Sequence, residues 1–291
     1  MTGDLFDPDT DLDPDKAGMV LFTVSSRINT DNNPDGESEG HGSAVDEKNI
    51  KLVLAYDGTR YHGWQRQVNG LSIQQVVEEK IATMTGGPVR LNASGRTDAG
   101  VHALGQVCNF IYRGRLTPSE FRKGLNSMLP EDIFVVEASS VSPEFHSRYS
   151  AKAKTYEYRI LNTTEPDIFL RHYVWHISRP LDNGSISQCL TRITGRRNFS
   201  SFQSAGSSVL NPIRTIHRAE IQLGPGGAIR MIFEADGFLR HMVRNIVGTV
   251  VEAGAGKMDP EAFSDILDAR DRSAAGVKAP ACGLFLVNVT Y

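Results

Sequence analysis

Runs of hydrophobic and alternating residues predict a series of short strands along most of the chain. The clearest is residues 50–56, IKLVLAY, a largely apolar run that ends at the turn Asp57-Gly58. Gly-Pro-Gly-Gly at residues 224–227 predicts a hairpin between two later strands. The other predicted strands are also rich in β-branched and aromatic residues, and they cover residues 89–93, 106–112, 133–138, 154–161, 174–177, 213–223, 228–235 and 283–291.

Apolar residues at spacings of three and four predict five helices between these strands. Ser72 followed by Gln75 is typical of a capped helix start, and it predicts a helix that runs to about residue 85. Thr117 followed by Glu120, with a proline after the threonine, marks a second start of the same kind. The remaining helices are predicted at residues 186–193, 238–253 and 260–269.

The order of these elements predicts the fold class. Each half of the chain combines several strands with at least two helices, which favours an α+β fold of two similar lobes. We expect a mostly antiparallel sheet with helices on one face. The N-terminal lobe is predicted at residues 49–150 and the C-terminal lobe at residues 151–291.

The charge of the chain is divided unevenly between its two parts. Residues 1–48 hold twelve Asp and Glu against three Lys and Arg, a net charge of −9. Since the whole chain carries −3, residues 49–291 carry +6. A segment with this composition buries too little apolar surface to offset its ordering entropy, so residues 1–48 are predicted to form a disordered acidic tail. The basic body suits a polyanionic partner.

The cysteines and the hydropathy of the chain indicate a compartment. Cys108, Cys189 and Cys282 are isolated, odd in number and outside any C-x-x-C motif, which is typical of reduced cysteines in a cytoplasmic protein. The apolar stretch at residues 19–24 is short and follows acidic residues, so it does not resemble a signal peptide. No apolar run approaches the length that spans a membrane, and we expect no membrane association.

Residues 93–106, ASGRTDAGVHALGQ, contain the clearest candidate for chemistry, the carboxylate of Asp98. Gly95 and Gly100 flank it, which suggests a backbone that turns sharply or that a ligand approaches closely. Arg96 lies two residues before Asp98 and is placed to orient it or balance its charge. The segment lies on the loop between two predicted strands. A polar surface turn with a local Arg–Asp pair is the alternative interpretation.

Two further groups of residues are candidates for a site. Tyr156 and Tyr158 share one face of the strand at 154–161, because strand side chains alternate. Arg240 and Arg244 are four residues apart in the predicted helix 238–253, so they are expected to lie together beside its apolar stripe. The alternatives are a pair of packed aromatic rings and two solvated helix positions.

Motifs for metals and cofactors are missing from the sequence. It contains no H-E-x-x-H, no Cys/His zinc pattern, no Walker A string and no G-x-G-x-x-G after a strand. His172 and His176 are four apart, but they lie in a strand-like run without an accompanying Glu. We therefore expect neither a metal nor a small-molecule cofactor.

Three motifs carry a resemblance to a known family. GRTDAGVHA at residues 95–103 closely resembles the hallmark G-R-T-D-x-G-V-H-A of the TruA family of tRNA pseudouridine synthases. Residues 145–160 resemble the family segment that supplies an active-site tyrosine, and residues 236–248 resemble its third motif. Further matching blocks lie at residues 56–67, 212–216 and 279–287, so the resemblance runs from about residue 50 to the C-terminus.

The resemblance implies a pseudouridine synthase fold and a tRNA substrate. It implies isomerisation of uridines at positions 38, 39 and 40 of the anticodon stem-loop, with Asp98, Tyr156 and Arg244 as catalytic residues. Arg244 is expected to pair with Asp98, and Tyr156 to offer a face for the base. Arg96 and Arg240 are expected to bind the substrate. The family works as a homodimer, and its reaction transfers no electrons and needs no cofactor.

Several alternatives stay open beside this interpretation. A carboxylate can attack the sugar C1′, add to the base or remove a sugar proton, and the residues do not distinguish these routes. The same chemistry can act on a different RNA uridine. A non-catalytic RNA-binding module with the same fold, or a hydrolase that uses Asp98 as general base, are the rival classes.

Overall fold

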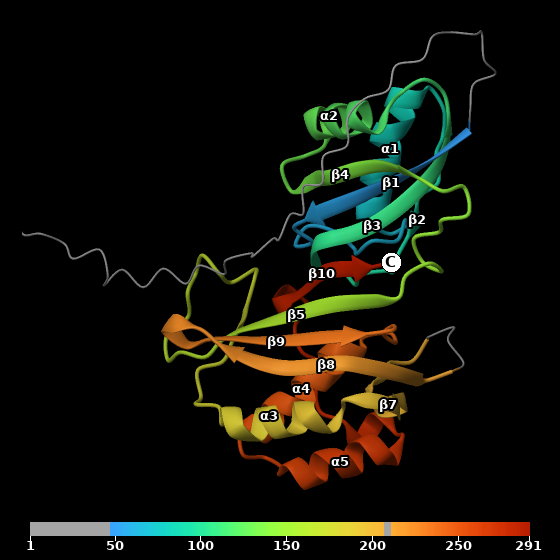
Figure 1. Ribbon diagram of the computed structural model, residues 1–291. Coiled ribbons are helices and arrows are strands. Elements are labelled where there is room, and N and C mark those ends of the chain that lie inside the picture. Colours follow the sequence, from blue (N-terminus) through green and yellow to red (C-terminus); the bar gives the residue numbers. More distant parts are fainter. Residues whose placement is uncertain (1–46, 207–210) are drawn as a thin grey trace, which may run out of the picture.

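The predicted strands join into one continuous sheet (Figure 1). The computed structural model describes residues 47–206 and 211–291. Within them the sheet has ten strands, and its main path runs β4-β1-β3-β10-β5-β9-β8-β7. The strands are β1 (Glu47–Tyr56), β2 (Asn92–Ala93), β3 (His102–Arg113), β4 (Ile133–Val141), β5 (Ala153–Leu161), β6 (Trp175–His176), β7 (Gly195–Asn198), β8 (Ile213–Leu223), β9 (Ala228–Ala235) and β10 (Leu284–Thr290).

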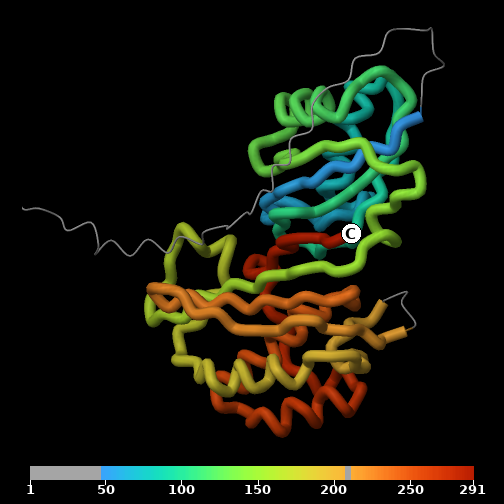
Figure 2. The backbone as a smooth tube through the Cα atoms, in the orientation of Figure 1, coloured from blue at the N-terminus to red at the C-terminus, as the bar shows by residue number. Residues whose placement is uncertain are grey.

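The last strand of the chain, β10, lies in the middle of the sheet (Figure 2). β10 pairs antiparallel with β5, and it pairs in parallel with β3, where Phe285 lies opposite His102. β6 is also parallel to β5, while the other pairings between described strands are antiparallel. The α+β class and the mostly antiparallel sheet are thus confirmed. The boundary between lobes at residues 150 and 151 stays a prediction, because β10 joins the two halves through hydrogen bonds.

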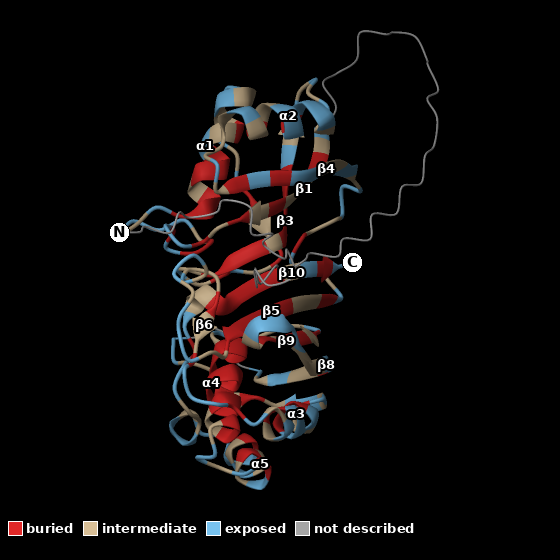
Figure 3. Ribbon diagram, turned by 90° about the vertical axis from the view of Figure 1, so that its left-hand side faces the viewer, coloured by how far each residue is buried: buried red, intermediate tan, exposed pale blue. Residues whose placement is uncertain are grey.

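Helices cover both ends of the sheet. α2 packs on β4 and α1 on α2, whereas α3 packs on β8, α4 and α5. Figure 3 shows α1 and α4 along the same side of the sheet. The helices are α1 (Ile73–Thr85), α2 (Pro118–Met128), α3 (Asn183–Arg192), α4 (Met242–Gly254) and α5 (Pro260–Ala269).

Both predicted helix caps, at Ser72 and Thr117, are present, but only one of them forms a full capping box. Thr117 and Glu120 satisfy each other's backbone N–H groups, so α2 has a full capping box. Ser72 accepts from the N–H of Gln75 at 3.3 Å. The Gln75 side chain instead donates to Glu79 at 2.9 Å, so this cap is satisfied from one side only.

Buried residues concentrate in the middle strands and in α4 (Figure 3). In α4 every residue except Glu252 is buried. Aromatic side chains fill the core at both ends of the sheet. Phe110 meets Phe121 edge-on at 5.2 Å, and Phe202 stacks on Phe263 at 5.8 Å. Because α4 has no solvated face, a charged side chain within it needs a partner.

Several predicted boundaries differ from the structure, and one strand was missed. β2 is shorter than predicted and β3 starts four residues earlier, at His102. Strand β7 was not predicted, because Gly-Arg-Arg-Asn has no hydrophobic alternation. It lies at the edge of the sheet that the described residues form, and it pairs with β8. β1 begins at Glu47, two residues inside the predicted tail, because Glu47 pairs with Arg113 by backbone register and by an ion pair of 2.7 Å. The rest of the predicted tail, residues 1–46, lies outside the described residues.

The helix predicted at residues 238–253 was wrong at its start. His241 has φ 61° and ψ 7°, a left-handed conformation, and α4 begins at Met242. Residues 238–240 therefore precede the helix, although their apolar spacing continues its pattern. Arg240 and Arg244 do not share a helix face, and the expectation that they lie together on one is corrected.

We predict that Gly58→Ala destabilises the fold. An ideal Cβ on Gly58 would lie 2.0 Å from the carbonyl oxygen of Val101, which is backbone and cannot move aside cheaply. Overpacking of this kind typically costs about 1–3 kcal/mol of unfolding free energy. Urea denaturation followed by circular dichroism measures it. Gly87→Ala is the control, because nothing lies within 4 Å of its Cβ. Equal midpoints for the two variants would contradict the prediction.

Candidate active site

The loop that carries Asp98 lies between β2 and β3 and is held by the segment that follows β1. The Thr97 hydroxyl lies 2.8 Å from the Tyr56 hydroxyl, and the N–H of Trp64 donates to the Thr97 carbonyl at 3.0 Å. Gly63 has φ 87°, and a Cβ there would meet the Thr97 carbonyl oxygen at 2.5 Å. The segment at residues 56–67 thus holds the Asp98 loop in place. Gly63 has no side chain, so the backbones of the segment and the loop can approach closely.

Asp98 and Arg244 form an ion pair although they are 146 residues apart. Arg244 Nη1 donates to Asp98 Oδ2 at 3.1 Å, and Arg244 Nε donates to the carbonyl of Ala279 at 2.8 Å. The Arg244 side chain is 10% exposed and that of Asp98 is 29% exposed. Two hydrogen bonds in different directions hold the guanidinium, so it presents one nitrogen to the carboxylate. The expected pairing of these two residues is formed.

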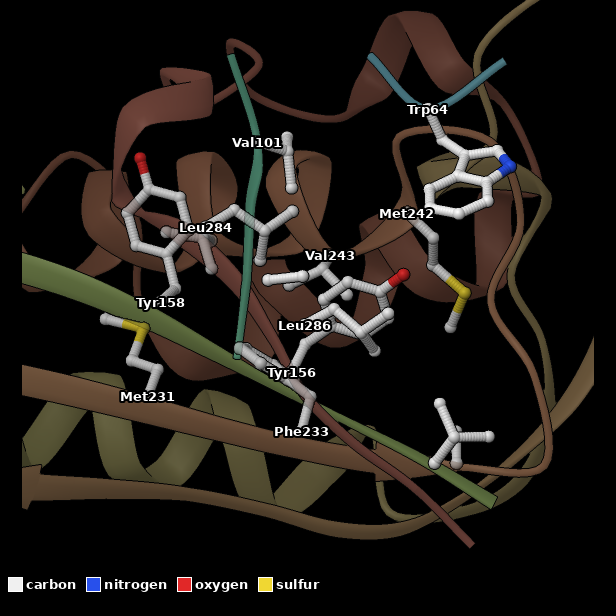
Figure 4. Close-up of a cluster of buried hydrophobic side chains, with 14 of the residues drawn as sticks. Trp64, Val101, Tyr156, Tyr158, Met231, Phe233, Met242, Val243, Leu284 and Leu286 are labelled. Carbon is white, nitrogen blue, oxygen red and sulfur yellow. The ribbon is translucent and has the colours of Figure 1, made fainter. Parts of the chain in front are cut away.

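Tyr156 lies on β5 beside this pair. Its ring is 8% exposed and meets Phe238 edge-on at 5.1 Å. Figure 4 shows Tyr156 in a cluster of buried side chains that includes Val243 and Leu286. Burial raises the pKa of the Tyr156 hydroxyl well above its ordinary value, so the group is protonated at neutral pH.

The two tyrosines predicted to share a face of β5 have separate environments. Tyr158 is fully buried, and its hydroxyl donates to the carbonyl of Pro280 at 2.8 Å. This contact ties β5 to the segment before β10, which also holds Ala279. Tyr156 borders the cleft that contains Asp98, whereas Tyr158 is a core residue.

A cleft of about 780 Å³ contains the Asp98–Arg244 pair, and its lining is strongly positive. Among the described residues that line it, Asp98 is the only acid. The cationic residues of the lining are Arg90, Arg96, Arg148, Lys154, Arg240 and Arg244. One carboxylate among six cations makes this cleft suited to a polyanion whose reacting part reaches Asp98.

Arg96 and Arg240 both line the cleft but neither contacts Asp98 by a hydrogen bond. Arg96 is exposed on the Asp98 loop. Arg240 is exposed before α4, and its Nη1 donates to the carbonyl of Ala205 at 2.9 Å. Both guanidinium groups are accessible to a ligand in the cleft, and Arg240 reaches it from the segment before the helix rather than from the helix itself.

Two other side chains at the site were not predicted from the sequence. His241 Nε2 lies 3.5 Å from Asp98 Oδ1, on the oxygen that Arg244 does not bind. Lys154 Nζ donates to the carbonyl of Ser94 at 2.6 Å, beneath the Asp98 loop. Burial, with smaller contributions from the charges of Arg148 and Arg214, lowers the pKa of Lys154 to about 8. Burial also lowers the pKa of His241, while the Asp98 carboxylate opposes this effect.

The described residues form neither a metal site nor a helix that could cross a membrane. Across residues 47–206 and 211–291, no three His, Cys, Asp or Glu side chains gather in a way that could hold a metal ion. His176 faces the Thr163 carbonyl at 2.7 Å, and the His172 carbonyl receives His102, so these two histidines make separate contacts. No helix in these ranges has the length and apolar character needed to cross a membrane.

The chain is similar in sequence to known proteins over most of its length. The family described as tRNA pseudouridine synthase matches residues 52–150 and 190–291. A protein of Acetivibrio thermocellus named tRNA pseudouridine synthase A is 43% identical over 244 residues, which cover 84% of this chain and 100% of that protein. A protein of the same name from Moorella thermoacetica is 45% identical over 245 residues, which cover 83% and 99%. A crystal structure of a Cbf5-Nop10-Gar1 complex aligns with a TM-score of 0.32 and 10% identity, over 69% of this chain and 45% of that one.

Proposed function

The chain belongs to the tRNA pseudouridine synthase family, and from this premise we propose that it isomerises uridines at positions 38, 39 and 40 of the tRNA anticodon stem-loop. The observation that carries the proposal is the cleft itself. It holds one carboxylate, Asp98, paired with Arg244 and surrounded by five further cations. The cations suit the RNA backbone, and the carboxylate is the group that can react with a nucleotide.

The reaction class agrees with this set of side chains. In the isomerisation the bond between N1 and C1′ breaks and a bond between C5 and C1′ forms. The proton on C5 leaves and N1 gains a proton, so atoms and electrons balance without a redox partner. Asp98 can attack C1′, add to the base or remove a sugar proton, and each of these routes requires its ionised form. Arg244 holds the carboxylate in place through the hydrogen bond of 3.1 Å from Nη1 to Oδ2.

Access to the uridine requires that the base leave the helical stem. Flipping a stacked base out costs a few kcal/mol. Tyr156 is proposed to receive the base on its ring, where aromatic stacking typically contributes ~1–3 kcal/mol. Arg96, exposed beside Asp98, is proposed to fill the vacated space or to bind the adjacent phosphate. Arg240 is proposed to bind phosphate at the rim of the cleft.

The rival classes make different demands on the site. A non-catalytic RNA-binding module has no need for a buried pair such as Asp98–Arg244. A hydrolase needs a base that activates water, and the structure does give Asp98 a histidine neighbour, His241, that the sequence did not predict. The curated relatives, however, bear the name of an isomerase across 84% of this chain, and we therefore favour isomerisation.

Two further features are proposed together with this function. A cytoplasmic location agrees with free Cys108 and Cys189, both buried, and with free Cys282, which is half-buried. A homodimer that binds one tRNA across both subunits is proposed from the resemblance to the TruA family. Sedimentation of the purified protein with and without tRNA measures the oligomeric state.

The target uridines can be mapped directly. Transcripts of a tRNA with uridine at positions 38, 39 and 40 are incubated with the protein, and pseudouridine is located by carbodiimide modification and primer extension. Transcripts with cytidine at each position in turn are the controls. Stops at these three positions support the proposal. Stops at other uridines would change the substrate, and the lack of any stop in a folded, tRNA-binding protein would favour the non-catalytic module.

We expect tRNA binding to depend on pH through Lys154, because burial lowers the pKa of this group to about 8. The ammonium is charged at pH 7.0 and mostly neutral at pH 8.5, so wild-type affinity is expected to fall over this interval. Lys154→Met should bind more weakly at pH 7.0, with a salt slope reduced by about 1. Its affinity should change less with pH.

Fluorescence anisotropy with labelled tRNA at both pH values and two salt concentrations measures these affinities. Lys123→Met is the matched control, because Lys123 is exposed on α2 and does not line the cleft. An equal pH dependence for wild type and Lys154→Met would refute the assignment.

A further inference from the structure

His241 occupies an unusual position at the site. Its φ of 61° lies in the left-handed region, which among the described non-glycine residues only Arg270 shares. This conformation ends the segment before α4 and turns the imidazole toward the Asp98 loop. As a result Nε2 lies 3.5 Å from Asp98 Oδ1.

The carboxylate of Asp98 is thereby contacted on both oxygens. Arg244 Nη1 donates to Oδ2 at 3.1 Å, and the His241 ring faces Oδ1. The two contacts come from opposite sides of the helix start: Arg244 lies in the first turn of α4, and His241 lies just before it. Two contacts of this kind restrict the rotation of the carboxylate more than either one alone.

The remaining surroundings of His241 favour its neutral form. Its side chain is 14% exposed, and Nδ1 is buried without a hydrogen-bond partner among the described residues. The charged groups that face the ring are Asp98 from its loop, Arg244 from α4, Arg240 from the preceding segment and Lys278 from the segment before β10. Burial and the three cations lower the pKa of His241, and Asp98 partly opposes them.

We propose that His241 is a positioning residue for Asp98, whose neutral imidazole lies with Nε2 against Oδ1 and keeps the carboxylate aligned in the cleft. The inference rests on the proposed function, because Asp98 is the reacting group there. Protonation of His241 places a second positive charge beside the Asp98 carboxylate. The charged imidazole then binds Oδ1 more tightly, and the carboxylate becomes a weaker nucleophile or base. Activity therefore falls at acidic pH as His241 becomes charged.

The substitution His241→Asn separates this role from a structural one. Asparagine tolerates the left-handed region, keeps an N–H donor and does not titrate. We expect His241→Asn to keep kcat within about tenfold of wild type at pH 7.5. Its rate should not show the decline at acidic pH that we expect of wild type. His241→Ala lacks the donor, and its kcat should fall by about 10- to 100-fold, with KM for tRNA within threefold.

Single-turnover rates between pH 5.0 and 8.0 test the proposal. His217→Asn is the control, because His217 is exposed on β8 and does not line the cleft. An acidic decline present in wild type and His217→Asn but absent in His241→Asn supports the proposal. The same decline in all three proteins would overturn it. Thermal unfolding of each variant shows whether a loss of rate reflects loss of the fold.

A second measurement does not depend on activity. NMR titration of the His241 ring in wild type and in Asp98→Asn reports whether the two side chains interact. Since the Asp98 carboxylate raises the pKa of His241, the pKa should be lower in Asp98→Asn than in wild type. An unchanged pKa of His241 in Asp98→Asn would contradict the proposed interaction between His241 and Asp98, even if the wild-type enzyme is active. A lowered pKa in a protein that modifies no tRNA would preserve the contact and reject the proposed function.

Discussion

Asp98→Asn is expected to reduce pseudouridine formation by at least about 10⁴-fold, the scale of loss when a nucleophile is removed. The amide has the shape of the carboxylate but cannot act as nucleophile or base. Binding of tRNA should stay within threefold of wild type, because the cations that line the cleft are unchanged. The variant should also be less stable, since it leaves the guanidinium of Arg244 without its counter-charge.

Rates from single-turnover assays and affinities from anisotropy check this expectation together. Asp268→Asn is the control, because Asp268 is exposed on α5 and lies outside the cleft. It should be as active as wild type. If Asp98→Asn turned over tRNA within tenfold of wild type, Asp98 would not be the reacting group.

Arg244→Ala is expected to lose both activity and stability. The Arg244 side chain is 10% exposed and bonds to Asp98 and to the carbonyl of Ala279, so its removal leaves a carboxylate and a carbonyl unpaired. Breaking one partner of a buried pair typically costs about 3–5 kcal/mol, and here we expect the lower end because Asp98 is partly exposed. The rate should fall by at least about 10³-fold, since the carboxylate is no longer held in place.

Arg240→Ala is the matched control for Arg244→Ala, because Arg240 lies four residues earlier in the chain. Its guanidinium is exposed and donates a hydrogen bond to the Ala205 carbonyl. We expect an unfolding free energy within about 0.5 kcal/mol of wild type, as for most surface substitutions, with weaker tRNA binding. Urea denaturation and single-turnover rates distinguish the two variants. Normal turnover in Arg244→Ala would remove the Asp98–Arg244 pair from the mechanism.

Local patterns predicted most elements of the fold because they depend on neighbouring residues. The capping box at Thr117 and Glu120 needs only residues three apart, and it is present as expected. The place of β10 between β3 and β5 could not be predicted in this way, because long-range pairing decides the order of strands in a sheet. The start of α4 was misplaced for a related reason. The left-handed backbone of His241 delays the start of the helix, while the apolar spacing continues through it.

The candidate site was predicted in part. Asp98 and Arg244 are far apart in the sequence, and only the resemblance to a family indicated that they meet. Lys154 could have been found from the residues alone, since it shares the face of β5 with Tyr156 by the same alternation that links Tyr156 to Tyr158. His241 carried no such signal. Its role depends on a backbone conformation that hydrophobic spacing does not encode.

The central claim is that the cleft around Asp98 moves the glycosidic bond of a tRNA uridine from N1 to C5. This exchange expels the hydrogen on C5, so tRNA that contains uridine labelled with tritium at C5 reports it directly. The account predicts that wild type releases one tritium to water for each uridine modified, and that Asp98→Asn releases none above background. Binding of tRNA without tritium release by the wild-type protein, or equal release by both proteins, would contradict it.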